Sequence, residues 1–185
     1  MTDRMIVGIS GASAQMLAVE TLKALREADF EVHLIATDTA KDIIESETEF
    51  SWDDVADLAD VVHSDDDMFA SVASGSYRTL GMIVVPCSMA TLAEISNGIA
   101  STLLTRAADV TLKERRKLVL VTRETPLSYI HLKNMSRVTK AGGVILPPMF
   151  TMYSKPGSIE DMARHIVGKV LDQLDIEHDL YRRWE

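Results

Sequence analysis

The sequence predicts an α/β fold, a doubly wound and mostly parallel sheet flanked by helices. Short apolar runs alternate with segments of helical length along the 185 residues, and a helix-length crossover is what joins two parallel strands. Several of these runs are apolar at every position, as in strands that are buried on both faces. No repeat, linker or low-complexity segment interrupts the alternation, so we expect residues 1–185 to form one domain.

The N-terminal half is expected to hold two clear strand–helix units and then a less regular excursion. We predict strands at residues 5–9 and 32–36, each followed by a helix, at residues 15–27 and 39–47. Residues 48–78 are rich in Asp and Ser, and only a short strand near residues 61–63 is expected there.

The C-terminal half continues the same alternation. Strands are predicted at residues 81–85, where Pro86 ends the run, and at 118–121 and 144–146. Helices are predicted at residues 90–96, 101–116, 127–140 and 158–174. In the last of these, Ser158 suits the N-cap, and Glu160 and Asp161 favour the positive end of the helix dipole.

The composition excludes several classes of protein. The formal net charge is −9 and the isoelectric point about 5.0, which argues against a general nucleic-acid binder with a basic face. The single cysteine, Cys87, allows no internal disulfide, and we expect it to be a buried, unreactive thiol. We see no signal-peptide layout, no apolar run of membrane-spanning length and no metal-ligand spacing, so a cytoplasmic protein without a bound metal is expected.

Small and hydroxyl-bearing residues follow several of the predicted strands. Ligands bind beyond the carboxyl ends of strands in such a sheet, and these loops converge there. Gly11 and Ser13 follow the first strand, where backbone amides at a helix start can face an anion, although Ser13 could equally cap that helix. Thr37 follows the second strand. Ser88 and Thr91 follow the strand at 81–85, and they suit either phosphate oxygens or another helix cap.

In the segment from residue 106 to residue 126, three of the cations and one of the carboxylates stand at positions that indicate a site. Arg106 and Lys113 are seven residues apart and share one helix face, while Arg123 and Glu124 follow a strand. We expect these groups to lie in one region, where the cations hold a phosphate and Glu124 moves a proton. The alternative for Arg106 and Lys113 is an ordinary solvated helix. Tyr153, in the loop after the last strand, can donate to a phosphate oxygen or sit at the edge of the core.

Several longer motifs resemble one family. They are GISGAS at residues 8–13, ASGS at 73–76, PCSMATL at 86–92, RAADVTLKERRKLVLVTRETP at 106–126, HLKNM at 131–135, GGVILPPMFTMY at 142–153 and DLYRRW at 179–184. Together they make the chain similar to the UbiX-type flavin prenyltransferases over nearly its whole length. The resemblance implies a Rossmann-like flavoprotein fold.

The resemblance also implies a reaction. Members of this family join the dimethylallyl group of dimethylallyl phosphate, or of the pyrophosphate, to reduced FMN at N5 and then at C6. The product, prenylated FMN, serves UbiD-type decarboxylases. The resemblance further implies that no metal is required and that the chain forms a homo-oligomer, typically a dodecamer with each site at a three-subunit junction.

Site residues are carried over from the family by position. The resemblance implies an FMN-binding set, a set for the prenyl phosphate, and a smaller catalytic set. The FMN set is Gly11, Ser13, Thr37, Ser88, Thr91 and Arg106, and the donor set is Lys113, Arg123, Tyr153, Lys169 and Trp184. The catalytic set is Glu124 as the proton-transfer residue, with Ser13 and Glu47.

Four positions depart from the usual family pattern. Ala14 replaces a glycine, and Asp67 stands where an apolar residue usually walls the prenyl pocket. Thr102 replaces an asparagine before the RAADV segment, and Lys169 replaces an arginine, which keeps the charge but loses the bidentate fork.

Two other functions remain open alternatives. An FMN-dependent decarboxylase of the phosphopantothenoylcysteine type shares the fold, but PCSMAT and RETP count against it. A non-catalytic FMN-binding flavoprotein is the second. Storage of a flavin requires no second phosphate site, so Lys113, Arg123, Glu124 and Tyr153 together count against it.

Overall fold

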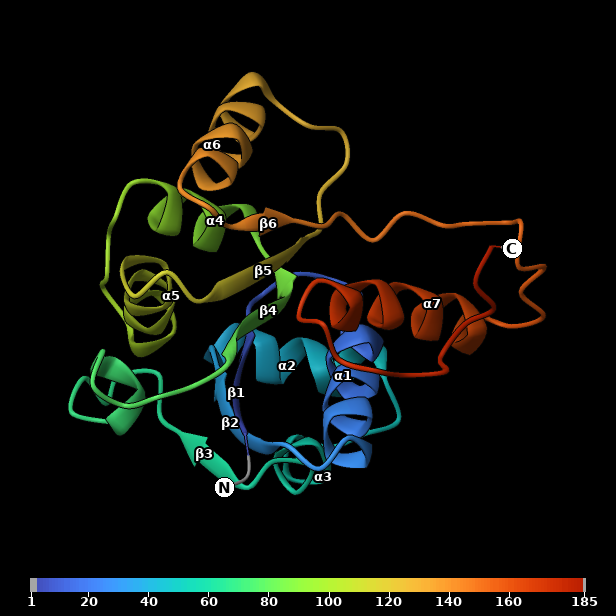
Figure 1. Ribbon diagram of the computed structural model, residues 1–185, viewed down its shortest axis with the longest axis horizontal. Coiled ribbons are helices and arrows are strands. Elements are labelled where there is room, and N and C mark those ends of the chain that lie inside the picture. Colours follow the sequence, from blue (N-terminus) through green and yellow to red (C-terminus); the bar gives the residue numbers. More distant parts are fainter. Residues whose placement is uncertain (1–2, 185) are drawn as a thin grey trace.

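The computed structural model describes residues 3–184 and contains the expected parallel sheet (Figure 1). Six strands pair in parallel in the order β3-β2-β1-β4-β5-β6. They are β1 (Arg4–Ile9), β2 (Glu31–Ala36), β3 (Val61–His63), β4 (Gly81–Cys87), β5 (Lys117–Thr122) and β6 (Val144–Ile145). The order reverses between β1 and β4, so the switch point at which such sheets bind ligands lies beyond these two strands.

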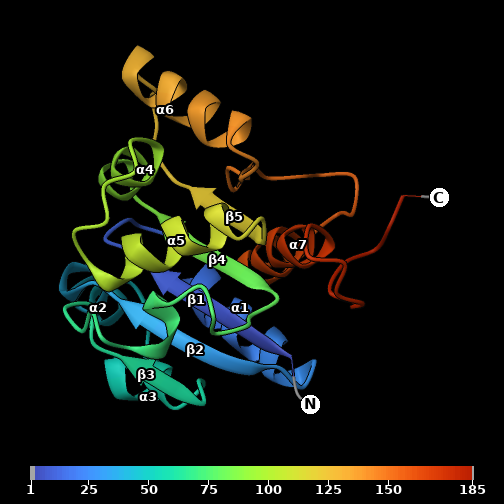
Figure 2. The same ribbon diagram turned by 60° about the vertical axis from the view of Figure 1, so that its left-hand side comes forward.

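Helices cover both faces of the sheet (Figures 1 and 2). One face is covered by α1 (Met16–Glu27), α2 (Asp38–Glu47), α3 (Trp52–Ala56) and α7 (Ile159–Asp172). The other is covered by η1 (Ser71–Ala73), α4 (Met89–Ser96), α5 (Leu103–Lys113) and α6 (Tyr129–Lys140). Met5 and Val7 of β1 belong to the first core and Ile6 to the second, because successive side chains of a strand point to opposite faces.

The predicted helices and strands are confirmed to within a few residues, with two differences. Pro86 does not end β4: the pairing with β5 shifts after Val84 and resumes at Cys87, because proline lacks the N–H that a regular ladder needs. The excursion at 48–78 also contains α3 and η1. A capping box formed by Ser51 and Asp54 begins α3 and is a readable sequence signal.

The described residues contain neither a membrane-spanning helix nor a metal-ligand cluster. None of the helices between residues 3 and 184 is both long and apolar enough to cross a membrane. In the same part of the chain, no three His, Cys, Asp or Glu side chains are grouped so that they could hold a metal ion.

Candidate functional site

The loops after β1 and β4 are tied together by Ser10, which is fully buried. Its hydroxyl donates to the carbonyl oxygen of Pro86 at 3.0 Å and accepts from the backbone N–H of Ser88 at 2.8 Å. These bonds fix the two loops relative to each other at the switch point of the sheet. Sequence reasoning missed Ser10, and the only signal was a serine directly after an apolar strand.

Glu47 occupies the start of α1. Its carboxylate, at the end of α2, accepts from the backbone N–H groups of Ala14 at 2.9 Å and Gln15 at 3.2 Å. Negative charge is favourable at this end of a helix. The amides of Ala14 and Gln15 therefore face a protein carboxylate, and anion binding by the loop of Gly11 and Ser13 stays a prediction. The capping alternative for Ser13 is wrong, because Gln15 is the N-cap residue of α1 and its own side chain does not cap the helix.

The first loop is held tightly by further contacts. The amide nitrogen of the fully buried Gln15 side chain donates to the carbonyl oxygens of Ala12 at 2.7 Å and Ser10 at 3.2 Å. A Cβ on Gly11 would lie 2.7 Å from the methyl carbon of Thr39, so a larger residue there would force Thr39 to move. Ala14 has a φ of 78°, in the left-handed region that favours glycine, which accounts for the glycine usual at this position.

Hydroxyl residues of the predicted FMN set cap the next two helices. Thr37 accepts from the N–H of Ala40 at 3.2 Å and caps α2. Ser88 accepts from the N–H of Thr91 at 3.2 Å, caps α4, and donates to the Thr91 hydroxyl at 3.0 Å. The capping interpretation of Ser88 and Thr91 is confirmed, and both residues lie at the carboxyl edge of the sheet.

Arg106 and Lys113 share one face of α5, as predicted, and both reach the loop after η1. Arg106 donates to the carbonyl oxygen of Ala73 at 3.2 Å and pairs with Asp109 at 2.8 Å. Lys113 pairs with Glu114 and lies against Gly75. A Cβ added to Gly75 would lie 2.9 Å from the ammonium nitrogen of Lys113. This loop, residues 73–77, therefore joins the two cations.

Arg116 holds the same loop and was missed from the sequence. Its guanidinium donates to the carbonyl oxygens of Gly75 at 2.7 Å and Tyr77 at 2.8 Å. In the sequence Arg116 stands among other cations, and nothing there distinguishes it from a solvated neighbour.

The prediction that three cations and Glu124 form one region is wrong within a single chain. Lys113 lies before the start of β5, whereas Arg123 and Glu124 follow its end. The strand is six residues long, so its two ends are roughly 20 Å apart. Because α5 runs antiparallel to β5, the last residue of the helix and the residues after the strand lie at opposite edges of the sheet. Glu124 is exposed, and the Arg123 Nε atom is buried without a hydrogen-bond partner among residues 3–184.

Cys87 is fully buried in the second core. Burial raises the pKa of its thiol far above the ordinary value. The predicted burial of Cys87 is confirmed, and an unreactive thiol is expected because only the thiolate is a good nucleophile.

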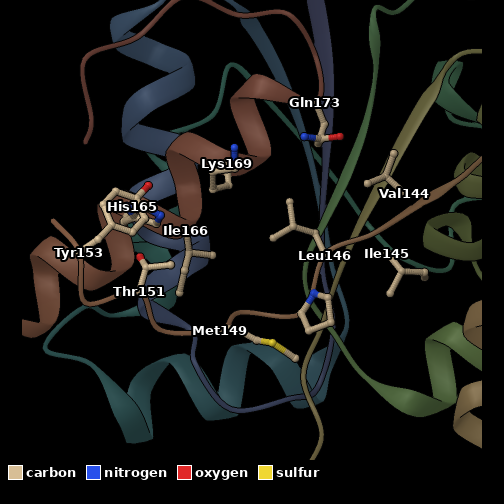
Figure 3. Close-up of a pocket in the computed structure, with 11 residues that line it drawn as sticks. Val144, Ile145, Leu146, Met149, Thr151, Tyr153, His165, Ile166, Lys169 and Gln173 are labelled. Atoms are coloured by element: carbon tan, nitrogen blue, oxygen red, sulfur yellow. The ribbon is translucent and has the colours of Figure 1, made fainter. Parts of the chain in front are cut away.

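A cavity of about 460 Å³ lies between α7 and the segment from β6 to Tyr153 (Figure 3). Lys169 and Tyr153 of the predicted donor set line it. The ring of Trp184 packs edge-on against Tyr153, with 5.5 Å between ring centroids. The structure thus brings Tyr153, Lys169 and Trp184 of the donor set together. Lys113 is not among the residues that line this cavity.

Lys169 is held by Asp172, one turn further along α7, at 3.0 Å. Partial burial alone would raise the pKa of Asp172, but hydrogen bonds from Tyr181, Lys169, Arg183 and His178 hold it far below the ordinary value. This cluster fastens the C-terminal segment to α7.

The departures at Asp67 and Thr102 have local structural roles. Asp67 accepts from the backbone N–H of Phe69 at 3.0 Å in a surface turn, and Phe69 is fully exposed. Thr102 and Thr105 form a capping box at the start of α5.

Comparison with known proteins places these observations in a family. The sequence profile of the Flavoprotein family matches residues 2–174. A probable UbiX-like flavin prenyltransferase of Escherichia coli O157:H7 is 51% identical over 183 residues, which cover 98% of this chain and 93% of that protein.

Two solved structures are similar over almost the full length. One is AnUbiX (PadA1) in complex with FMN and dimethylallyl pyrophosphate: the TM-score is 0.99, the identity 50%, and the match covers 100% of this chain and 98% of that one. The other is described as a dodecameric FMN-dependent UbiX-like decarboxylase from Escherichia coli O157:H7, with a TM-score of 0.96, 51% identity, and coverage of 98% and 99%.

Proposed function

This chain belongs to the flavoprotein family and, within it, to the UbiX-type flavin prenyltransferases; we propose that it transfers a dimethylallyl group to reduced FMN. The donor is dimethylallyl phosphate or the pyrophosphate, and the product is FMN prenylated at N5 and C6, which a UbiD-type decarboxylase takes up. The observation that carries the proposal is the likeness, over the whole chain, to a protein solved with both FMN and a dimethylallyl donor.

The cavity beside Arg123 fits the hydrocarbon part of the prenyl donor. This largely apolar cavity of about 260 Å³ is lined by Ala14, Met16, Phe150, Ile166 and Arg123, among others. The buried Arg123 Nε atom lacks a partner within the described part of the chain. An apolar cavity that contains one unsatisfied N–H donor suits a small molecule that joins a hydrocarbon to a phosphate.

We assign the binding of FMN to the loops at the carboxyl edge of the sheet. Gly11 allows close approach of the backbone, and Ser13, Thr37, Ser88 and Thr91 supply hydroxyl groups, with Arg106 for the flavin phosphate. Reduced FMN supplies the nucleophilic N5 and the ring carbon C6 at which the new ring closes. No metal takes part in this proposal.

We assign the donor to Lys113, Arg123, Tyr153, Lys169 and Trp184. The first four present N–H or O–H donors to the phosphate, and preorganised cations lower the barrier to its departure from carbon. Lys113 and Arg123 flank β5 at opposite ends, so one chain cannot supply both to a single phosphate. We therefore propose that copies of the chain share each site in a homo-oligomer, which agrees with the dodecamer described for the E. coli protein.

We assign proton transfer to Glu124. Ring closure adds a proton to the double bond of the attached prenyl group, joins its tertiary carbon to C6 and removes the C6 proton. The exposed Glu124 carboxyl group can donate the first proton and accept the second, on a flavin held by a neighbouring copy. Ser13 supports this step from the first loop, and Glu47 supports it from the end of α2 by holding the amides of Ala14 and Gln15. We also propose that the chain is one domain and works in the cytoplasm.

The test is anaerobic. The purified protein is mixed with reduced FMN and dimethylallyl phosphate, and the extracted flavin is weighed by mass spectrometry. A flavin heavier by one five-carbon prenyl unit is expected. Tightly bound but unmodified FMN, with either donor, would favour an FMN-dependent decarboxylase or a non-catalytic flavoprotein instead.

A further inference from the structure

His165 lies in the middle of α7 and has no role in the assignments above. Its side chain is buried, with 5% of the residue exposed, and it lines two adjoining cavities. Its Nδ1 atom is fully buried and has no hydrogen-bond partner among residues 3–184. A buried polar atom without a partner is costly, so a partner from outside the described chain is expected.

The surroundings of His165 indicate the chemistry of that partner. His165 and Lys169 of α7, and Gln173 at its C-cap, follow one another at four-residue intervals, and all three line the cavity of about 460 Å³. Thr151 and Tyr153 add hydroxyl groups on the same side, while Val144, Ile145 and Leu146 form an apolar wall opposite (Figure 3). A cavity with a polar wall and an apolar wall suits a small molecule that joins a polar head to a hydrocarbon.

The charge around this polar wall favours an anion. One carboxylate, Asp172, is shared by two cations, Lys169 at 3.0 Å and Arg183 at 2.9 Å. The aromatic rings of Tyr153 and Tyr181 pack on His165 with centroids at 5.6 and 4.4 Å. The adjoining cavity, of about 240 Å³, contributes Lys155, Asp161 and Arg182. Cations outnumber carboxylates in this set.

We propose that His165 is a further donor-binding residue: its imidazole donates a hydrogen bond to the phosphate of the dimethylallyl donor and takes up a proton as the donor binds. This inference rests on the proposed function. In the free protein, burial and then the positive charge of Lys169 lower the pKa of His165, against the opposing effect of Asp172, so the ring is neutral at neutral pH. A phosphate dianion beside the ring favours the imidazolium and reverses that shift.

The experiment measures binding without turnover. FMN-loaded enzyme is kept oxidised, so that the carbon–nitrogen bond cannot form, and dimethylallyl phosphate is titrated into it in a calorimeter at pH 7.5. Two buffers of different ionisation enthalpy give the number of protons taken up. At pH 7.5 the free donor phosphate is almost entirely dianionic, because its second pKa is about 6, so it exchanges few protons on binding and the difference between variants reports on His165.

Three variants separate a binding role from a packing role. His165→Phe keeps an aromatic ring against Tyr153 and Tyr181 but removes both ring nitrogens. His165→Asn keeps an amide near the place of Nδ1 but cannot take up a proton. His63→Gln, on β3 and far from α7 in the sheet order, is the matched control, since burial also lowers the pKa of His63.

We expect His165→Phe to weaken donor binding about tenfold and to abolish the proton uptake, while FMN affinity stays unchanged. His165→Asn should recover most of the affinity without the uptake, and His63→Gln should match the unsubstituted enzyme. Donor affinity and proton uptake in His165→Phe equal to those of the unsubstituted enzyme would overturn the inference and leave the proposed function intact. Failure of the unsubstituted enzyme both to bind the donor and to prenylate FMN would overturn both.

Discussion

The two halves of the candidate site are built differently. The flavin half, at the ends of β1 and β4, is held by buried hydrogen bonds from Ser10 and Gln15 and by the carboxylate of Glu47. The donor half is exposed: Tyr153 is 44% and Trp184 79% accessible, and Lys113 and Glu124 are also exposed. The flavin half is therefore already ordered within one chain. The donor half is open, as expected if other copies of the chain complete it.

The surface near the donor half supports this interpretation. Large apolar side chains are exposed along the segment that leads to α7, and they are Met149, Phe150, Met152 and Ile159. Contiguous exposed apolar side chains are typical of protein interfaces. In an oligomer they would be covered, and Tyr153 would be buried with them.

The largest effect is expected from Glu124→Gln, in the donor half. The amide keeps the size of the side chain but cannot act as a base, so formation of prenylated FMN should fall about a thousandfold. FMN affinity, measured by fluorescence quenching, should not change because Glu124 is not in the flavin half. Turnover close to that of the unsubstituted enzyme would remove Glu124 from its assigned role.

Lys113→Ala is expected to weaken binding of the prenyl donor without changing the affinity for FMN. Loss of one charge-assisted contact should raise KM for dimethylallyl phosphate about thirtyfold and leave the Kd for FMN unchanged. Lys117→Ala, which removes an exposed cation four residues away, is the control and should change neither constant. Equal losses for donor and flavin in Lys113→Ala would move Lys113 to the flavin phosphate.

Glu47→Ala tests whether the flavin half is preorganised by its cap. The variant leaves the N–H groups of Ala14 and Gln15 without their acceptor, which should lower the free energy of unfolding by about 1 kcal/mol. FMN affinity should fall severalfold, while KM for the donor changes less. Urea unfolding and flavin titration measure both effects, with Glu49→Ala as the control; a loss confined to turnover would assign Glu47 to chemistry alone.

The smallest expected effect is a change of melting temperature with pH that depends on His63. Burial, and then the charge of His33, lower the pKa of His63, against the effect of Asp67, and the two imidazoles bond at 2.9 Å. A lowered pKa contributes stability that is present above the unfolded value near 6.5 and is lost as pH falls through the folded value. The melting temperature should therefore drop below pH 6.5, and less in His63→Gln. An equal drop in both proteins would assign the loss to other groups.

The sequence predicted the scaffold better than the site. Continuous apolar runs and N-cap residues are local signals, so β1, β4 and α7 could be located from the chain alone. The positions of Lys113 and Arg123 could not, because neighbours in sequence on an antiparallel helix and strand end at opposite edges of the sheet. Glu47 on the amides of α1 and the buried Nδ1 of His165 depend on tertiary packing, which leaves no pattern in the sequence.

The most direct test of a site divided between copies combines two impaired variants, at a donor concentration far below KM, so that the raised KM of Lys113→Ala also lowers its rate. Lys113→Ala and Glu124→Gln are co-expressed with different tags, the mixed oligomer is isolated, and prenylated FMN is quantified by mass spectrometry under anaerobic conditions. With random assembly, about one quarter of the sites receive both native residues, so activity should return to about a quarter of the unsubstituted level. A mixed oligomer as inactive as either variant alone would contradict the account.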